Sequence, residues 1–178
     1  MSIKNLKIGE NFPKELNVVI EIPKGSQNKY EYDEEMDIIK LDRVLHSPMF
    51  YPTDYGFIPE TRSEDGDHLD ALVVGSTSFF VGTVVKIRPI ALFNMIDQGE
   101  KDTKIIGVAV GDPRFAHIKS KDDLPEHLYK EISHFFSEYK RLENKKVEVE
   151  GWHDKKEAWD EIKKAFDKYK EEILEKNK

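Results

Sequence analysis

The sequence predicts an α+β fold that is mainly β, a largely antiparallel barrel or sheet with helices late in the chain. Strand-like segments fill the chain up to residue 110, and amphipathic helical patterns come only after residue 125. Such segregation of strands and helices is typical of α+β folds. We found no internal repeat or linker, and 178 residues suit one hydrophobic core, so residues 1–178 are expected to form a single domain.

Six segments before the helices carry a strand signal, which is either alternation or a short apolar run bounded by turn residues. They are residues 17–22, 29–33, 38–44, 71–74, 83–93 and 104–110. In the second segment, alternation places Lys29 and Glu31 on one face and Tyr30 and Tyr32 on the other. If the tyrosines face the core, the charged pair faces solvent or a cleft.

Residues 48–59 are rich in proline and aromatic residues. Proline disfavours both a regular helix and a central strand, so this segment is expected to be irregular. Phe50 and Phe57 are expected to cover the core, whereas the hydroxyl groups of Tyr51 and Tyr55 can reach a polar site.

Two helices are predicted near the end of the chain, over residues 126–142 and 155–175, with a strand-like alternation at residues 146–152 between them. Leu124-Pro125 suits the start of the first helix. Apolar residues recur in both at three- and four-residue spacing. In the first helix these are Leu128, Ile132, Phe135, Phe136, Tyr139 and Leu142, and in the second Ala158, Trp159, Ile162, Phe166, Tyr169 and Ile173.

Composition excludes several classes of protein. The net charge of −7 argues against binding nucleic acid by phosphate attraction alone. The absence of cysteine excludes disulfides, thiolate metal sites and cysteine nucleophiles. No apolar run is long enough to span a bilayer, and the first residues lack a signal-peptide core, so a cytoplasmic protein without membrane association is expected.

Two acidic turns carry the chemistry that the sequence suggests. Asp65, Asp67 and Asp70 lie within six positions on a turn that leads into a strand. Carboxylates that converge repel one another unless a positive group lies between them, and a hard divalent cation with oxygen ligands is the usual answer. A second acidic turn, residues 97–102, also lies between two strands and can supply carboxylates to the same place. The alternative is a solvated acidic turn without a ligand.

Three other classes of site can be weighed on the same residues. An EF-hand loop starting at Asp65 would need glycine and glutamate where Asp70 and Ser76 stand, so it fails. A phosphatase with an aspartate nucleophile requires an apolar strand before the Asp-x-Asp pair, but residues 60–64 are polar. A nucleic-acid-binding OB-fold would account for a barrel and the aromatic residues, but it leaves the two acidic turns unexplained.

The motifs together resemble the family I inorganic pyrophosphatases, in a bacterial or archaeal form. The most specific block is Asp65-Gly66-Asp67-His68-Leu69-Asp70, similar to the family pattern Asp-(Ser/Gly/Asn)-Asp-Pro-x-Asp. The other blocks follow in the expected order: Lys29-Tyr30-Glu31, Asp42-Arg43, Tyr51-Pro52-x-x-Tyr55-Gly56, Met95-x-Asp97 through Asp102-x-Lys104, and His134-Phe135-Phe136-x-x-Tyr139-Lys140. Six blocks in register argue strongly against a chance match.

The resemblance implies magnesium-dependent hydrolysis of diphosphate to two phosphates by a metal-activated water, with several Mg²⁺ ions per active site. It also implies a five-stranded OB-like closed barrel flanked by C-terminal helices, and assembly into a homohexamer. Neither nucleic acid nor a membrane is an expected partner.

The same resemblance implies a role for each matching residue. Asp67 is the candidate general base. Asp70 bridges two ions and Glu21 acts through water; the complete set of implied metal residues is Asp65, Asp70, Asp97, Asp102, Glu31 and Glu21. The implied substrate-binding residues are Lys29, Arg43, Lys104, Tyr139 and Lys140, with Tyr55 beside them.

Two positions depart from the family pattern. His68 stands where the pattern has proline, and Ala109 stands where related chains often have proline. Replacing proline with histidine removes a backbone restraint between Asp67 and Asp70 and adds a titratable ring. His68 is expected to be an exposed turn residue rather than a metal ligand. Neither change removes an implied ligand, so activity is expected to persist.

Overall fold

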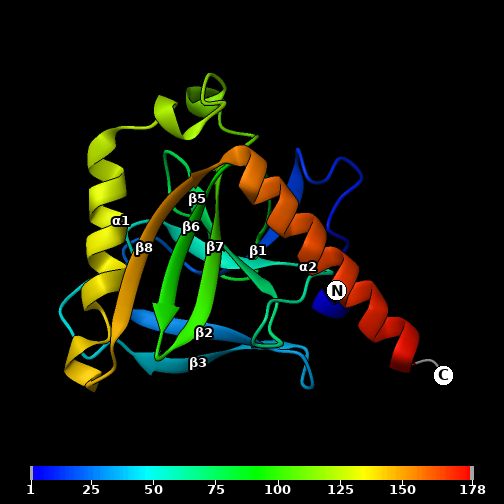
Figure 1. The fold of residues 1–178 in the computed structure, drawn as a ribbon, viewed down its shortest axis with the longest axis horizontal. Coiled ribbons are helices and arrows are strands. Elements are labelled where there is room, and N and C mark those ends of the chain that lie inside the picture. The colour runs from blue at the N-terminus through cyan, green and yellow to red at the C-terminus, as the bar shows by residue number, and fades with distance from the viewer. Residues whose placement is uncertain (1, 177–178) are drawn as a thin grey trace.

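Five strands close into a ring in the computed structural model, which describes residues 2–176 (Figure 1). They pair in the order β1 (Leu16–Ile22), β4 (Asp54–Ile58), β5 (Leu69–Val74), β7 (Glu100–Ala109) and β6 (Val84–Asp97). The ring closes because β1 also pairs with β6. All neighbours are antiparallel except β5 and β7, which are parallel. The predicted five-stranded OB-like closed barrel in a mainly β protein is confirmed.

The long strand β6 can serve two neighbours because it is 14 residues long and changes register between Pro89 and Ala91. Its first part, residues 84–87, pairs with β1. Its second part, residues 91–97, pairs with a sixth strand, β8 (Val147–Asp154), which lies outside the ring. A proline cannot donate to a neighbouring strand, so it is tolerated at such a break in the pairing.

The hairpin of β2 (Asn28–Asp33) and β3 (Ile38–Val44) forms a separate two-stranded sheet. It crosses one end of β6 and β7 (Figure 1). Its place at this end makes it one wall of the cavity described below.

The first predicted helix is shorter than expected. Helix α1 covers Glu126–Glu138, and a separate 3₁₀ turn follows at Arg141–Glu143. Leu142 therefore leaves the apolar face of the helix and is 61% exposed. Other short 3₁₀ helices lie at Ile3–Asn5, Pro113–Phe115 and Lys121–Asp123.

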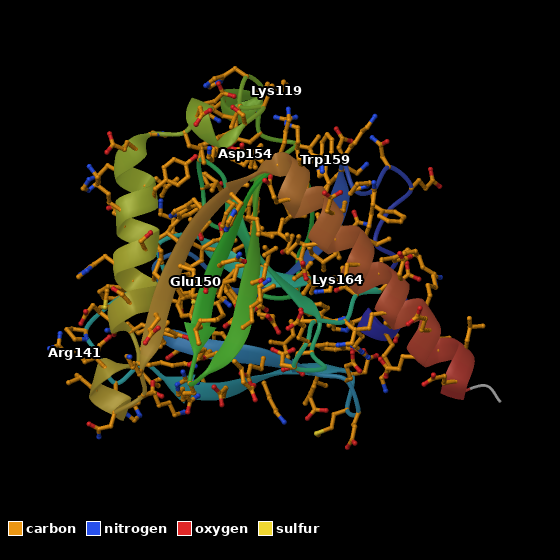
Figure 2. All side chains as sticks on the ribbon, viewed as in Figure 1. Lys119, Arg141, Glu150, Asp154, Trp159 and Lys164 are labelled. Carbon is orange, nitrogen blue, oxygen red and sulfur yellow. The ribbon has the colours of Figure 1, made fainter. Side chains whose placement is uncertain are left out.

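The second predicted helix, α2 (Lys155–Lys176), has nearly the expected bounds. Its polar face and the outer face of β8 carry charged side chains, among them Lys164 and Glu150 (Figure 2). Within residues 2–176, no helix is long and apolar enough to cross a membrane.

The strands bury side chains on both faces, and each face packs against a different helix. In β5, Leu69, Ala71 and Val73 join a cluster that contains Ala158 and Ile162 of α2. Leu72 and Val74 of the same strand join a second cluster that contains Phe135 and Phe136 of α1. Successive side chains of a strand point to opposite faces, and both faces of β5 are buried. Its sequence is therefore a nearly continuous apolar run.

Strand β4 corrects the expectation that residues 48–59 are irregular. Pro52 and Pro59 flank this strand instead of interrupting it, so all five residues can pair and are buried. Gly56 allows β1 to come close, because a Cβ atom there would lie 1.9 Å from the carbonyl oxygen of Val19. Phe57 is in the core as predicted.

The companion prediction that Phe50 covers the core is wrong, because its ring is 56% exposed. Phe50 precedes β4 and lies on a segment without regular structure, where no pairing fixes its ring against the core.

Candidate active site

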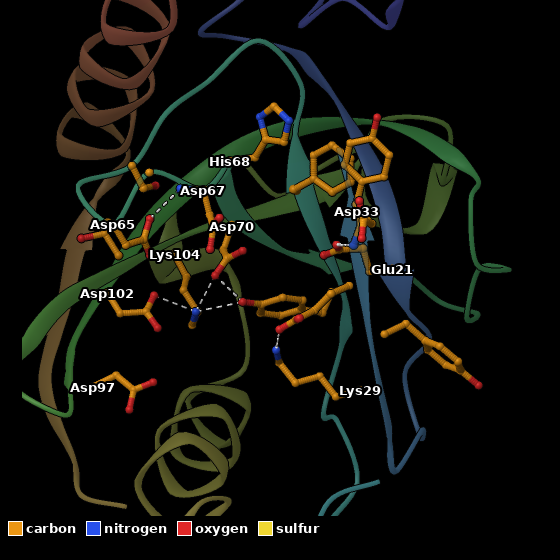
Figure 3. A pocket seen from close by; sticks show the side chains of 18 of the residues that line it. Glu21, Lys29, Asp33, Asp65, Asp67, His68, Asp70, Asp97, Asp102 and Lys104 are labelled. Atoms are coloured by element: carbon orange, nitrogen blue, oxygen red, sulfur yellow. Dashed lines mark hydrogen bonds and ion pairs between the residues drawn. The ribbon is translucent and has the colours of Figure 1, made fainter. Parts of the chain in front are cut away.

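One cavity of about 470 Å³ lies between the β2–β3 hairpin and the two acidic turns. Its lining includes the side chains of seven acidic residues that the sequence singled out: Glu21, Glu31, Asp65, Asp67, Asp70, Asp97 and Asp102. Lys29, Tyr55, Lys104, Tyr139 and Lys140 also line it, whereas Arg43 does not. Figure 3 shows how Glu21, Asp65, Asp70, Asp97 and Lys104, among others, converge from segments that are far apart in the sequence.

The pairing of the strands brings the two acidic turns together. In the parallel pair of β5 and β7, Asp70 lies opposite Lys104. In the hairpin of β6 and β7, Asp97 lies opposite Glu100 across the turn Gln98-Gly99. Both turn residues have positive φ, 53° and 92°, as a two-residue hairpin turn requires, and glycine suits the second position. The convergence expected from the sequence is therefore a product of the barrel's topology.

The ammonium group of Lys104 lies between two of the converging carboxylates. Its side chain is 2% exposed, and its Nζ is 2.8 Å from both Asp70 Oδ2 and Asp102 Oδ1. It also donates to the hydroxyl of Tyr55 at 2.9 Å (Figure 3). An ammonium has three hydrogens to donate, so these partners satisfy it fully. Burial alone would lower the pKa of Lys104, but Asp102 and Asp70 outweigh burial and raise it.

Asp70 lies at the centre of this group. Its Oδ2 accepts a short hydrogen bond from the Tyr55 hydroxyl in addition to the one from Lys104. Burial raises the pKa of Asp70, and Asp102 adds to the increase, while Lys104 opposes it. A carboxylate whose charge is disfavoured in this way gains from any further positive charge nearby.

Asp67 lies on the first acidic turn, where its backbone N–H donates to Asp65 Oδ1 at 3.0 Å. Burial raises the pKa of the Asp67 carboxyl, and the charges of Asp65 and Asp70 add to this. A carboxyl whose pKa is raised towards neutrality is a better proton acceptor than an ordinary aspartate.

Glu21, the charged residue within an apolar strand, turns its side chain to the cavity. It is 7% exposed, and its Oε1 accepts the backbone N–H of Tyr32 at 2.7 Å. Burial, followed by the charge of Asp70, raises the pKa of Glu21 to about 8. The odd position of this residue in the sequence is thus explained by the site.

Two further lysines pair with acidic groups at the cavity. Lys29 contacts Glu31 closely and Asp42 at 3.4 Å, and Lys140 contacts Asp97 Oδ2 closely. The second oxygen of Asp97, Oδ1, is buried without a hydrogen-bond partner. An unsatisfied buried oxygen on an acidic cavity wall is a position where a cation or a donor would be stabilising.

Arg43 stands beside the cavity and is held by two acids. Its Nη1 is 2.6 Å from Asp42 Oδ2, and its Nε donates to Glu143 Oε1 at 3.0 Å. Its Nη2 is buried without a partner. The guanidinium is thus oriented with one donor free, but the structure does not place it among the lining residues.

The donor set fits a hard cation. Carboxylate oxygens are the ligands that Mg²⁺ prefers, and ten acidic residues line this one cavity, seven of them singled out by the sequence. Among residues 2–176, no three acidic or histidine side chains already stand close enough together to hold an ion. Lys104 holds Asp70 and Asp102 in this arrangement, so metal binding requires these carboxylates to adjust.

The prediction that His68 is an exposed turn residue is wrong. Its side chain is 13% exposed, and its ring stacks on Phe57 at 4.8 Å. Its Nδ1 is 2.9 Å from the carbonyl oxygen of Thr61, and its Nε2 is 2.6 Å from Glu34 Oε1. Burial lowers the pKa of His68, although Glu34 opposes this. A ring with acceptors on both sides and an aromatic face to pack on is held inside the protein.

Several lining residues were not assigned from the sequence. Asp33 also lines the cavity, and its position two residues after Glu31 in a strand was the available signal. Glu34 lines it too, and its partner Arg62 is 28 residues away in the sequence, with no pattern that links the two.

The chain is similar to known proteins in sequence and in structure. The family model described as inorganic pyrophosphatase matches residues 18–170. The inorganic pyrophosphatase of Geobacillus stearothermophilus is 55% identical over 133 residues, which cover 75% of this chain and 81% of that protein. The one from Saccharolobus solfataricus is 54% identical, over 81% of this chain and 86% of that protein.

Among solved structures, the crystal structure of the inorganic pyrophosphatase from Thermus thermophilus superposes with a TM-score of 0.92 at 46% identity. The match covers 96% of this chain and 99% of that one.

Proposed function

The chain belongs to the family I inorganic pyrophosphatases and is an inorganic diphosphatase, and we propose that it hydrolyses diphosphate in this cavity in a magnesium-dependent reaction. The observation that carries the proposal is the convergence of ten acidic residues and five lysines on one cavity, among them the seven acidic residues and three lysines that the sequence singled out. A cavity with both signs of charge suits a polyanion that binds together with cations.

The proposed metal residues are the acidic groups of the two turns. Asp65, Asp70 and Asp102 would hold the first ion, with Asp70 shared with a second. Asp97 and Glu31 would serve ions that arrive with the substrate, and Glu21 would act through water. When bound, Mg²⁺ neutralises phosphoryl oxygens and lowers the pKa of water.

Asp67 is the proposed general base. Its carboxyl lines the cavity and has a raised pKa, so it can accept the proton of the water that attacks phosphorus. The new bond forms between that water oxygen and one phosphorus, and the bond to the bridging oxygen breaks. The second phosphate leaves with the bonding electrons.

The basic residues are proposed to bind the phosphoryl oxygens. Lys29 and Lys140 line the cavity, and Lys104 can exchange one of its present acceptors for a phosphate oxygen. Tyr55 and Tyr139 are buried beside them and offer hydroxyl groups to the same region. For Arg43, the buried and unpartnered Nη2 is the donor available to the substrate. Such positioned donors stabilise charge on the transferring group.

The assembly and the location of the enzyme rest on the family resemblance and on the sequence. We propose a homohexamer of this chain in the cytoplasm, acting on free diphosphate without nucleic acid or a membrane as a partner.

A phosphate-release assay tests the proposal directly. Purified protein should release phosphate from diphosphate with Mg²⁺ and lose this activity with EDTA, and ATP should be a much poorer substrate. Ca²⁺ should inhibit, because its larger and looser coordination misplaces the reacting groups. Equal rates with and without EDTA, or full activity with Ca²⁺ alone, would contradict the metal assignment.

A further inference from the structure

The guanidinium of Arg62 lies beside the cavity and links two segments that share no strand pairing. These are the β2–β3 hairpin, through Glu34, and helix α2, through Glu172. Arg62 Nη1 and Nη2 bind the two carboxylate oxygens of Glu34 at 2.6 and 2.8 Å. Its Nε donates to Glu172 Oε2 at 2.6 Å. The Arg62 side chain is 8% exposed and that of Glu34 is 42% exposed, so this is a two-pronged ion pair whose arginine is buried and whose carboxylate lies at the surface.

Arg62 is anchored to helix α2. Its backbone N–H donates to the carbonyl oxygen of Ala165 in α2 at 2.8 Å. Its guanidinium lies 5.4 Å from the ring centre of Tyr169, on the same helix. Together with Glu172, these contacts fix the loop that leads to Asp65 and Asp67 against α2.

Glu34 belongs to the other wall of the cavity. It lies in the turn between β2 and β3, directly after Asp33, and the strand that ends there carries Lys29 and Glu31. The hairpin pairs only with itself among the strands of the sheet. An isolated two-stranded hairpin is marginally stable, so its position depends on contacts with the rest of the chain. Besides the pair with Arg62, these include Asp37 Oδ1, which accepts the backbone N–H of Lys4 at 3.1 Å, and the backbone N–H of Tyr32, which donates to Glu21 at 2.7 Å.

We propose that Glu34 and Arg62 are positioning residues that hold the tip of the β2–β3 hairpin against the acidic loop and so set the opening of the diphosphate cavity. The effect on diphosphate hydrolysis rests on the proposed function. The contact between the hairpin and the acidic loop does not depend on it. Neither residue needs to touch substrate.

The same pair also fixes His68, the neighbour of Asp67. Glu34 Oε1 is 2.6 Å from His68 Nε2, while Arg62 Nη1 is 3.3 Å from His68 Nδ1. The ring stacks on Phe57, which in turn stacks on Tyr32 of the hairpin at 5.0 Å. Hairpin, His68 and the acidic turn therefore form one packed unit.

Loss of the ion pair should release the hairpin without unfolding the barrel. Glu34→Gln keeps the shape of the side chain but removes its charge, so the charged link between Arg62 and the hairpin is lost while Glu172 still compensates Arg62. If the hairpin is then in its binding position only a tenth of the time, the apparent KM for diphosphate rises about tenfold, because apparent affinity falls with the competent fraction. We expect kcat to change much less, because the bound state restores the same geometry.

Glu35→Gln is the matched control. It removes the same charge one residue away, from an exposed side chain that makes no contact with Arg62 in the described interactions. An equal rise of KM in both variants would show a general charge effect and overturn the proposal. A fall of kcat with no change of KM in Glu34→Gln would overturn it as well.

A second measurement is independent of activity. The chain has no cysteine, so spin labels can be attached at Met36→Cys, at the exposed hairpin turn, and at Lys163→Cys, on the exposed face of α2. The distance distribution between the labels should be narrow in the parent and in Glu35→Gln, and broader in Glu34→Gln. An unchanged distribution in Glu34→Gln would overturn the proposal even if KM changed. A parent protein without diphosphatase activity would refute the proposed function, and the label distances would still decide whether the pair holds the hairpin.

Discussion

The buried environment of the Glu21 carboxyl makes the free energy of unfolding depend on pH. Its pKa is raised from 4.5 to about 8, mainly by burial. A carboxyl with a raised pKa in the folded state contributes stability below its unfolded pKa, and this contribution is lost as the pH rises through the folded value.

We therefore expect the metal-free protein to lose stability between about pH 5 and pH 8. Glu21→Gln should reduce this loss, which amounts to at most a few kcal/mol given about 1.4 kcal/mol per pKa unit. Urea unfolding at several pH values in EDTA measures both proteins. Parallel pH profiles for the two proteins would show that Glu21 does not cause the dependence.

A second residue-scale prediction separates Asp67 from Asp70. Asp70 lies among Tyr55, Lys104 and Asp102 at the proposed metal position, so Asp70→Asn should weaken Mg²⁺ binding and activity together. Asp67→Asn should keep most of the Mg²⁺ affinity and lose rate by roughly 10²–10⁴, the range typical of a general base. Its activity should partly recover at high pH, where hydroxide is available.

Titration calorimetry with Mg²⁺ and a pH–rate profile measure the two effects separately. Loss of metal binding in Asp67→Asn, with normal binding in Asp70→Asn, would reverse the two roles.

The sequence predicted Asp65, Asp67, Asp70, Asp97 and Asp102 because they cluster on two short turns, whereas Glu21 and Glu31 were implied only by the family resemblance. It did not predict the burial of His68, since stacking on Phe57 and contact with Glu34 depend on the hairpin's position. Local sequence carries no signal for a contact between residues that only the tertiary fold brings together.

At the scale of elements, strand β4 shows where sequence rules were insufficient. The prolines of residues 48–59 predict an irregular segment, but Pro52 and Pro59 only flank the strand at Asp54–Ile58. The helices were predictable because their apolar residues recur over several turns, and the other strands because alternation or a short apolar run is bounded by turn residues. Leu142 continued the helical period beyond Glu138, where the chain leaves the helix for a 3₁₀ turn and Asn144 takes a left-handed conformation.

At the scale of elements, we predict the effect of a substitution at Gly56 on the pairing of β1 and β4. A methyl group at this position would lie 1.9 Å from the Val19 carbonyl oxygen, so Gly56→Ala must push β4 away from β1. We expect a loss of roughly 3 kcal/mol or more, in the range of severe core substitutions. Activity should also fall, because Tyr55 is the adjacent residue.

Gly111→Ala is the control, since an added Cβ at Gly111 meets no atom within 4 Å. Thermal and urea unfolding of both variants measure the difference. Similar stability for Gly56→Ala and Gly111→Ala would mean that the close approach of β1 and β4 is not a constraint.

At the scale of the whole molecule, the single domain predicted for residues 1–178 stays a prediction, as does the homohexamer. Apolar side chains at Phe50, Phe80 and Leu142 are 56%, 87% and 61% exposed. Association that covers such side chains would be favourable. Light scattering at working concentration should give a mass several times the 20.8 kDa of one chain. A mass near that of one chain would refute the assembly.

We propose that the cavity between the hairpin and the two acidic turns binds the catalytic cations. Anomalous diffraction from crystals soaked with Mn²⁺, which accepts the same oxygen ligands as Mg²⁺, tests it most directly. We predict anomalous peaks bounded by Asp65, Asp70 and Asp102, and loss of these peaks in Asp70→Asn. Strong peaks elsewhere with none in this cavity, in crystals of a protein that hydrolyses diphosphate with Mn²⁺, would contradict the account.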